Sequence, residues 1–218
     1  MKHLNLSGCK FITKLPNLCT PNLEILDLSY CVNLVEIHES GEFLHKLKTW
    51  YLSFCQKLQN LPNNLMLTSL EVLEHLTLIG CKNLRDLPDG IYKLQQLRRL
   101  STPTAKLRPT CNSFDSSFGY GFLKMTYLKV WANTSIIELD PLMKPDYFPA
   151  WECILLSATN IITIPESNRL RTLLLHNCKH LREIQGLPLS ISRVDAYNCP
   201  LLDYESPSGL LNQVSLFL

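Results

Sequence analysis

One pattern of apolar and polar residues recurs along the chain, and it is clearest from Leu76 to Pro88, LTLIGCKNLRDLP. Its template, LxLxxCxxLxxLP, begins with two alternating leucines, passes through a cysteine and ends with apolar residues at every third position. Self-similarity with a period of a few tens of residues is typical of stacked repeat proteins. The pattern predicts that each recurrence is one coil of a solenoid.

Nine recurrences align on the alternating apolar pair. In the four amino-terminal units the second leucines, Leu6, Leu28, Leu52 and Leu78, lie 22 to 26 residues apart. The first apolar residue of each pair is, in chain order, Leu4, Leu26, Trp50, Leu76, Leu100, Leu128, Ile154, Leu173 and Val194. From the fifth unit onward the cysteine is lost in three consecutive units, and it returns at Cys178.

Two stretches lack the pattern. Residues 110–122, TCNSFDSSFGYGF, are dense in Ser, Gly and aromatic residues and have no period of two or 3.6, which indicates an insertion loop. The last residues also carry no repeat. We therefore expect a solenoid of about nine units over residues 1–204, with the loop at 110–122, and a non-repeat carboxy-terminal tail over residues 205–218.

The LxL alternation sends both leucines to one face of a short strand. Neighbouring strands about 4.8 Å apart complete its hydrogen bonds and cover its leucines, and the sheet is parallel because every coil turns the same way. The apolar residues at every third position, followed by proline, favour short 3₁₀ turns and extended chain. The predicted fold is an α/β leucine-rich repeat solenoid, a horseshoe with a short-stranded parallel concave sheet and a mostly 3₁₀ or irregular convex side.

Charge and the chain ends identify no nucleic-acid or membrane partner. The net charge is +2, from 21 basic and 19 acidic residues, without a run of five like charges. Lys2, Lys10 and Lys14 interrupt the amino terminus, so no secretory signal is predicted. The apolar run Val214 to Leu218 is too short to cross a bilayer core of about 30 Å. We expect a cytoplasmic protein, with the nucleus as a second possible compartment.

Nine cysteines raise the question of disulfides or metal binding. Six of them share one column of the repeat: Cys9, Cys31, Cys55, Cys81, Cys178 and Cys199. This column predicts small buried side chains with little need of a hydrogen-bond partner. Adjacent coils also bring Cα atoms within reach of a disulfide ladder, but parallel side chains and the absence of a secretion signal favour reduced thiols.

The sequence offers no catalytic, cofactor-binding or metal-binding constellation. It contains neither GxSxG nor a GxxxxGK phosphate-binding loop followed by Ser or Thr. Alternation along the strand points His176 outward and Cys178 inward, so these two side chains do not converge on a metal. The prediction is a protein that is not an enzyme and has no cofactor.

Candidate binding residues lie on the outward face of the strands. The position after the second leucine holds Trp131, His176 and Tyr197, and the next position adds Tyr30 and Phe54. A solenoid's concave face is its usual recognition surface, and exposed aromatic residues are typical interface anchors. The alternative is that these aromatic side chains stack along the sheet or pack under the insertion loop.

The units LNLSGCK, LDLSYCVNLVEI, LTLIGCKNLRDLPDGI and LRTLLLHNCKHLREIQGLP resemble the leucine-rich repeats of plant TIR-type nucleotide-binding disease resistance proteins. The segment VDAYNCPLLD, Val194 to Asp203, is similar to their closing repeat. The TIR and nucleotide-binding domains of that family are missing here, which suggests a fragment or a truncated gene product.

The resemblance implies a protein-recognition module in defence signalling. Its partners would be a pathogen effector or a guarded host protein and, for autoinhibition, the nucleotide-binding domain of a full-length receptor. Two alternatives stay open: a non-catalytic accessory domain of a TIR-type NAD-cleaving enzyme, and a truncated structural remnant without activity.

The repeat register predicts that Leu78→Ala destabilises the fold by about 2–5 kcal/mol, because it opens a cavity in the core. Lys82→Ala, four positions along on the predicted surface, should change stability by less than about 0.5 kcal/mol. Thermal or denaturant unfolding of both variants measures the difference. Equal melting temperatures would show that the register is wrong.

Overall fold

The computed structural model describes residues 1–15, 18–37, 44–62, 69–84, 87–103, 122–131, 149–158, 168–184 and 187–203. Residues 110–121 of the predicted insertion loop and the predicted tail, 205–218, lie outside these ranges. The proposed domain boundaries therefore stay predictions.

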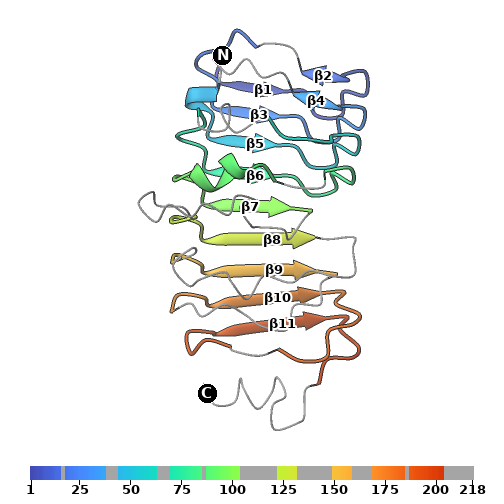
Figure 1. The fold of residues 1–218 in the computed structure, drawn as a ribbon, viewed down its shortest axis with the longest axis vertical. Helices are drawn as coiled ribbons and strands as arrows, with labels where there is room; N and C mark the ends of the chain where they lie inside the picture. The colour runs from blue at the N-terminus through green and yellow to red at the C-terminus, as the bar shows by residue number, and fades with distance from the viewer. Residues whose placement is uncertain are drawn as a thin grey trace.

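A nine-stranded parallel sheet forms one wall of the molecule, and its strands follow one another in chain order (Figure 1). Its strands are β1 (His3–Asn5), β3 (Ile25–Asp27), β5 (Thr49–Tyr51), β6 (His75–Thr77), β7 (Arg99–Thr102), β8 (Tyr127–Trp131), β9 (Cys153–Ser157), β10 (Thr172–His176) and β11 (Arg193–Tyr197). The described helices are both 3₁₀: η1 (Leu44–Lys46) and η2 (Asp89–Lys93). The predicted leucine-rich repeat solenoid is confirmed.

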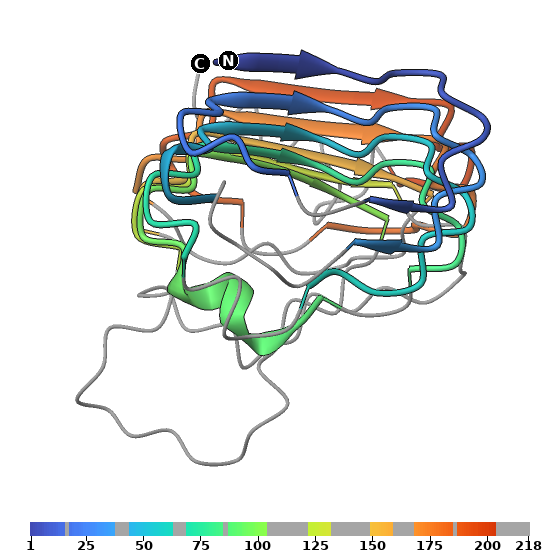
Figure 2. The same cartoon turned by 90° about the horizontal axis from the view of Figure 1, so that it is seen from above.

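The sheet is bowed. Viewed along the stack, the middle strands lie lower than the strands near the two ends, so the face that points away from the coil interior is concave (Figure 2). The opposite face points into the coils and carries the leucines. Strand alternation thus separates a core face from an open concave face.

The ladder register places the first apolar residues of all nine units in one line, from Leu4 opposite Leu26 to Leu173 opposite Val194. Trp50, at this position in the third unit, is completely buried, as are Leu26 and Leu100. Burying a side chain of this size stabilises the fold by roughly 1.5–3 kcal/mol. The core is therefore a continuous stack of equivalent side chains.

The convex side begins with a second, two-stranded parallel sheet of β2 (Lys14–Leu15) and β4 (Glu36–Ile37). Leu15 and Ile37 are buried, while Lys14 pairs with Glu36 across 2.9 Å on the exposed side. This arrangement agrees with the expected mixture of extended chain and 3₁₀ turns.

The cysteine column has a role beyond packing. The thiols of Cys31, Cys55 and Cys81 each donate a hydrogen bond of 3.1 Å to the second-leucine carbonyl of the preceding coil. The same carbonyls of Leu6, Leu28 and Leu52 also accept the turn N–H of their own coil's cysteine. The predicted burial of these thiols is confirmed. Their hydrogen bonds were not predicted, and they form because each cysteine turn lies directly against a carbonyl of the coil before it.

The residue before the cysteine position has a positive φ in every coil where it is described. These residues are Gly8, Tyr30, Phe54, Gly80, Ala158, Asn177 and Asn198, with φ between 54° and 79°. At Gly80 a second constraint applies, because a Cβ there would lie 2.5 Å from Cδ1 of Phe54. At Gly8 a Cβ would meet no atom within 4 Å.

We therefore predict that Gly80→Ala destabilises the fold more than Gly8→Ala. Both variants carry the left-handed backbone penalty of about 1–2 kcal/mol, but only Gly80→Ala forces the Phe54 ring to move. Denaturant unfolding measures the difference, and Phe54→Ala combined with Gly80→Ala should remove the excess. Equal costs at the two glycines would contradict the observed packing.

Candidate protein-interaction face

The concave face of β8 to β11 brings three of the predicted binding residues into one row. The ladder places Trp131 opposite Ser157, Ser157 opposite His176, and His176 opposite Tyr197. Trp131 is 44% exposed and Tyr197 is 68% exposed. His176 is half-buried and meets the Tyr197 ring edge-on, with the ring centroids 6.2 Å apart. The row therefore presents two solvent-exposed aromatic side chains, Trp131 and Tyr197, with the imidazole of His176 between them.

Tyr30 and Phe54 lie apart from that row, in the turns that follow β3 and β5. Their rings stack with centroids 4.8 Å apart and an interplanar angle of 10°. The Phe54 ring also lies against Gly80. For this pair the structure shows the stacking arrangement, and their role in binding stays a prediction.

Sequence reasoning missed three further residues of the concave face, at the positions before and between the paired apolar residues. The guanidinium of Arg99 lies 4.6 Å from the centroid of the Tyr127 ring, and the Lys129 ammonium lies 5.8 Å from that of Trp131. Their outward direction follows from strand alternation. The same alternation that predicts the direction of Trp131 therefore also predicts that Arg99, Tyr127 and Lys129 point outward.

Burial makes three cysteines of the sheet and its turns, Cys31, Cys153 and Cys199, poor nucleophiles. Burial raises the pKa of Cys31 to about 11 and that of Cys199 to about 11. Cys153 lies on the concave face beside Tyr127, and burial raises its pKa as well. A reactive cysteine needs a lowered pKa, so these three thiols are protonated at neutral pH.

The described residues contain no group of three His, Cys, Asp or Glu side chains placed to hold a metal ion. The structure puts Cys178 in the core and His176 on the opposite face of the strand. The contacts that the structure shows on the concave face are aromatic, cation–aromatic, hydrogen-bonding and ion-pair contacts.

Comparison with known proteins places this fold in a family, although no protein-family model matches the chain. The chain is 38% identical over 103 residues to the disease resistance protein RML1A of Arabidopsis thaliana. This aligned segment covers 47% of the chain and 10% of the relative. The disease resistance protein RPP2A of the same plant is 32% identical over 177 residues, or 79% of the chain and 12% of the relative. TMV resistance protein N of Nicotiana glutinosa is 34% identical over 140 residues, or 64% of the chain and 12% of the relative.

The chain belongs to the leucine-rich repeat region of plant disease resistance proteins. The resemblance to TIR-type receptors that the repeats suggested is confirmed by these homologues. The chain spans only about a tenth of the length of the first of these relatives. None of the helices in the described ranges has the length and apolarity that a membrane crossing requires.

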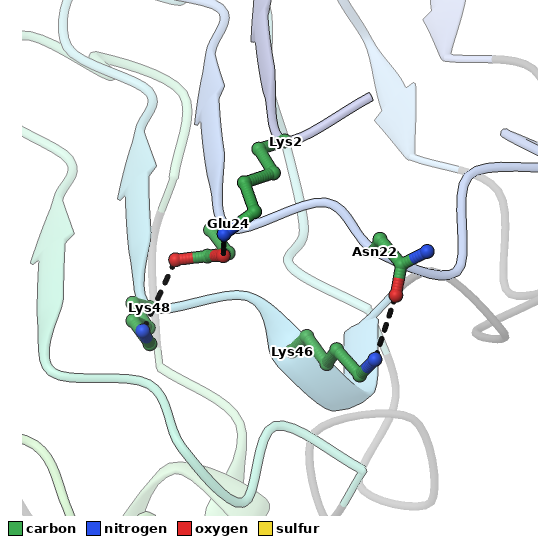
Figure 3. Close-up of polar contacts among 5 residues, drawn as sticks. All are labelled: Lys2, Asn22, Glu24, Lys46 and Lys48. Carbon is green, nitrogen blue, oxygen red and sulfur yellow. Dashed lines mark hydrogen bonds and ion pairs between the residues drawn. The ribbon is translucent and has the colours of Figure 1, made fainter.

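The solenoid of this family member also carries a column of charges just before each of its first five sheet strands, β1, β3, β5, β6 and β7. In the first five coils the position holds, in order, Lys2, Glu24, Lys48, Glu74 and Arg98, so the sign alternates from coil to coil. Figure 3 shows Glu24 between its two lysines: Oε1 lies 2.7 Å from Lys2 Nζ, and Oε2 lies 3.0 Å from Lys48 Nζ. One turn away, Lys46 Nζ donates to Asn22 Oδ1 across 2.6 Å.

These contacts lower the pKa of Glu24 to about 2, chiefly through the hydrogen bonds from Lys2 and then Lys48. A shifted pKa in a group of charges can mark a catalytic site. Here the partners are exposed lysines on adjacent coils and no second carboxylate or nucleophile is among the contacts drawn in Figure 3. The triad therefore reads as a structural clamp between the first three coils.

Glu24→Gln should lower the melting temperature at neutral pH, since it removes the charge that both lysines contact. Because the folded-state pKa is below the ordinary value of 4.5, the contribution is complete above pH 4.5 and disappears as the pH falls towards 2. Thermal unfolding from pH 7 to pH 2 should show the wild type and the variant converging. Glu71→Gln, at an exposed position, is the matched control, and a constant Glu24→Gln deficit down to pH 2 would exclude the clamp.

Proposed function

We propose that this chain is a protein-recognition module of a disease resistance protein, which senses a pathogen effector or a guarded host protein through its concave face. The homology to disease resistance proteins supports a role in plant defence. The single observation that supports the recognition role is the row of residues from Trp131 to Tyr197. Its two solvent-exposed aromatic side chains lie on neighbouring, hydrogen-bonded strands of one sheet.

A rigid sheet suits recognition for a physical reason. Each strand from β8 to β11 is hydrogen-bonded to its neighbours, so the row is fixed before a partner arrives. Preorganised side chains lose little conformational entropy on binding. Tyrosine and tryptophan are also enriched among residues that dominate interface energies. The row thus has both the composition and the support of an interface centre.

The second part of the proposal is a contribution to autoinhibition. The same face, or the coil edges beside it, would contact the nucleotide-binding domain of a full-length receptor and hold it inactive in the absence of an effector. The module itself would carry out no chemistry and would work in the cytoplasm or the nucleus, where such receptors act by the family resemblance.

Site-specific photo-crosslinking tests the proposal. The chain carries benzoylphenylalanine at position 131 or 197 and is co-expressed in leaves with candidate effectors, guarded host proteins and the nucleotide-binding domain of a full-length relative. We expect a crosslinked product with at least one of these proteins from both concave positions. The matched control is the same probe at Gln59, an exposed residue of the convex side.

Crosslinks from position 59 with none from 131 or 197 would move the interface away from the concave face. The absence of crosslinks to any tested protein from both concave positions would argue against recognition by this face altogether. Products with the nucleotide-binding domain alone would support autoinhibition and not effector sensing.

A further inference from the structure

Two cations lie next to each other on the concave face and each contacts an aromatic ring. Arg99 on β7 lies over Tyr127, which is its ladder neighbour on β8. Lys129, two residues further along β8, lies near the Trp131 ring of the same strand. Arg99 is exposed and Lys129 is half-buried, so neither charge is taken out of water by the fold.

Neither cation has a carboxylate partner within the described part of the chain. Other basic side chains at the sheet do: Arg98 pairs with Glu74, Arg193 with Asp195, and Lys48 with Glu24. The ladder neighbours of Arg99 and Lys129 are His75, Tyr127, Ser101 and Leu155, none of which carries a negative charge at neutral pH. Among the residues that the structure describes, the centre of the concave face therefore carries positive charge without a carboxylate partner.

Apolar surface adjoins this charge. Leu155, opposite Lys129 in the ladder, is only 8% exposed and lies beside the half-buried Leu174, while Trp131 is 44% exposed. A carboxylate close to apolar side chains would complement both parts of this surface. A nucleic-acid strand suits this surface less well, because phosphate backbones are usually neutralised by many cations and two are present here.

We propose that β7 to β10 bind an acidic, apolar segment of a partner protein, with a carboxylate between Arg99 and Lys129 and an apolar side chain against Trp131 and Leu174. This inference rests on the proposed recognition function and specifies the chemistry of what is recognised. The charge complementarity steers the segment to the face, and the aromatic and aliphatic contacts hold it.

The fluorescence of Trp131 provides a local readout for a direct test. The chain has three tryptophans, and Trp50 and Trp151 are completely buried, so quenching by acrylamide reports mainly on Trp131. The probes are short capped peptides without tryptophan in which leucine alternates with aspartate, asparagine or lysine, and an oligouridylate. We expect the aspartate peptide to protect Trp131 and its binding to weaken as salt is added.

The variant Arg99→Gln/Lys129→Gln should weaken binding of the aspartate peptide about tenfold at low salt, given the worth of two partly exposed charge contacts. Lys57→Gln/Lys82→Gln removes the same net charge from exposed turn positions outside the concave face and should bind like the wild type. Thermal unfolding of both variants confirms that they fold.

The chemistry of the proposal is overturned if the asparagine or lysine peptide binds as well as the aspartate peptide, or if the control variant loses as much affinity as Arg99→Gln/Lys129→Gln. Protection of Trp131 by oligouridylate alone would assign the cations to nucleic acid and overturn it too. Failure of every probe, together with crosslinks from positions 131 and 197, would leave the recognition function standing and remove this inference. The absence of those crosslinks would count against the recognition function itself.

Discussion

The pairing of each strand with the coil before it is the constraint on which the rest of the structure depends. A strand of three to five residues cannot hold itself together, because its backbone groups and its leucines are covered only by the neighbouring coils. The repeated backbone bonds show how this is done: just before each strand, two successive N–H groups donate to one carbonyl of the preceding coil, as Glu24 and Ile25 do to Lys2. The same contact recurs from β1 to β11.

Once the coils are in register, equivalent residues of successive repeats form columns with a fixed spacing. The kind of contact made between neighbouring coils differs from one column to the next. Thiols reach the carbonyl of the coil before them, charges of alternating sign approach within ion-pair distance, and the rings of Tyr30 and Phe54 meet at 4.8 Å. That ring distance is close to the separation of adjacent strands in a sheet, about 4.8 Å. These contacts follow from the stacking and also reinforce it, because each one joins a coil to its neighbour only.

The regular register of the strands also orders the side chains of the concave face, which makes this face suited to recognition. Residues that are far apart in sequence, such as Trp131 and Tyr197, occupy one row because their strands share a register. The corresponding row begins with Ser7, Ser29 and Ser53, whereas the later coils carry aromatic residues and two cations that have no carboxylate partner in the described part of the chain. The face therefore differs chemically along its length although its backbone hardly changes, and the later coils are where a partner would find the most distinctive surface.

The sequence by itself determined the solenoid, the strand positions, the inward direction of the leucines and cysteines and the outward direction of Trp131, His176 and Tyr197. It could do so because side-chain direction in a strand has a period of two and the repeat copies that period in every coil. The contacts between coils were decided only by the tertiary structure. The thiol bonds, the ring that makes Gly80 sterically necessary, the Glu24 clamp and the contact of Arg99 with Tyr127 join residues about one repeat apart. Whether such side chains meet depends on the angle and spacing of neighbouring coils, which a one-dimensional pattern does not contain.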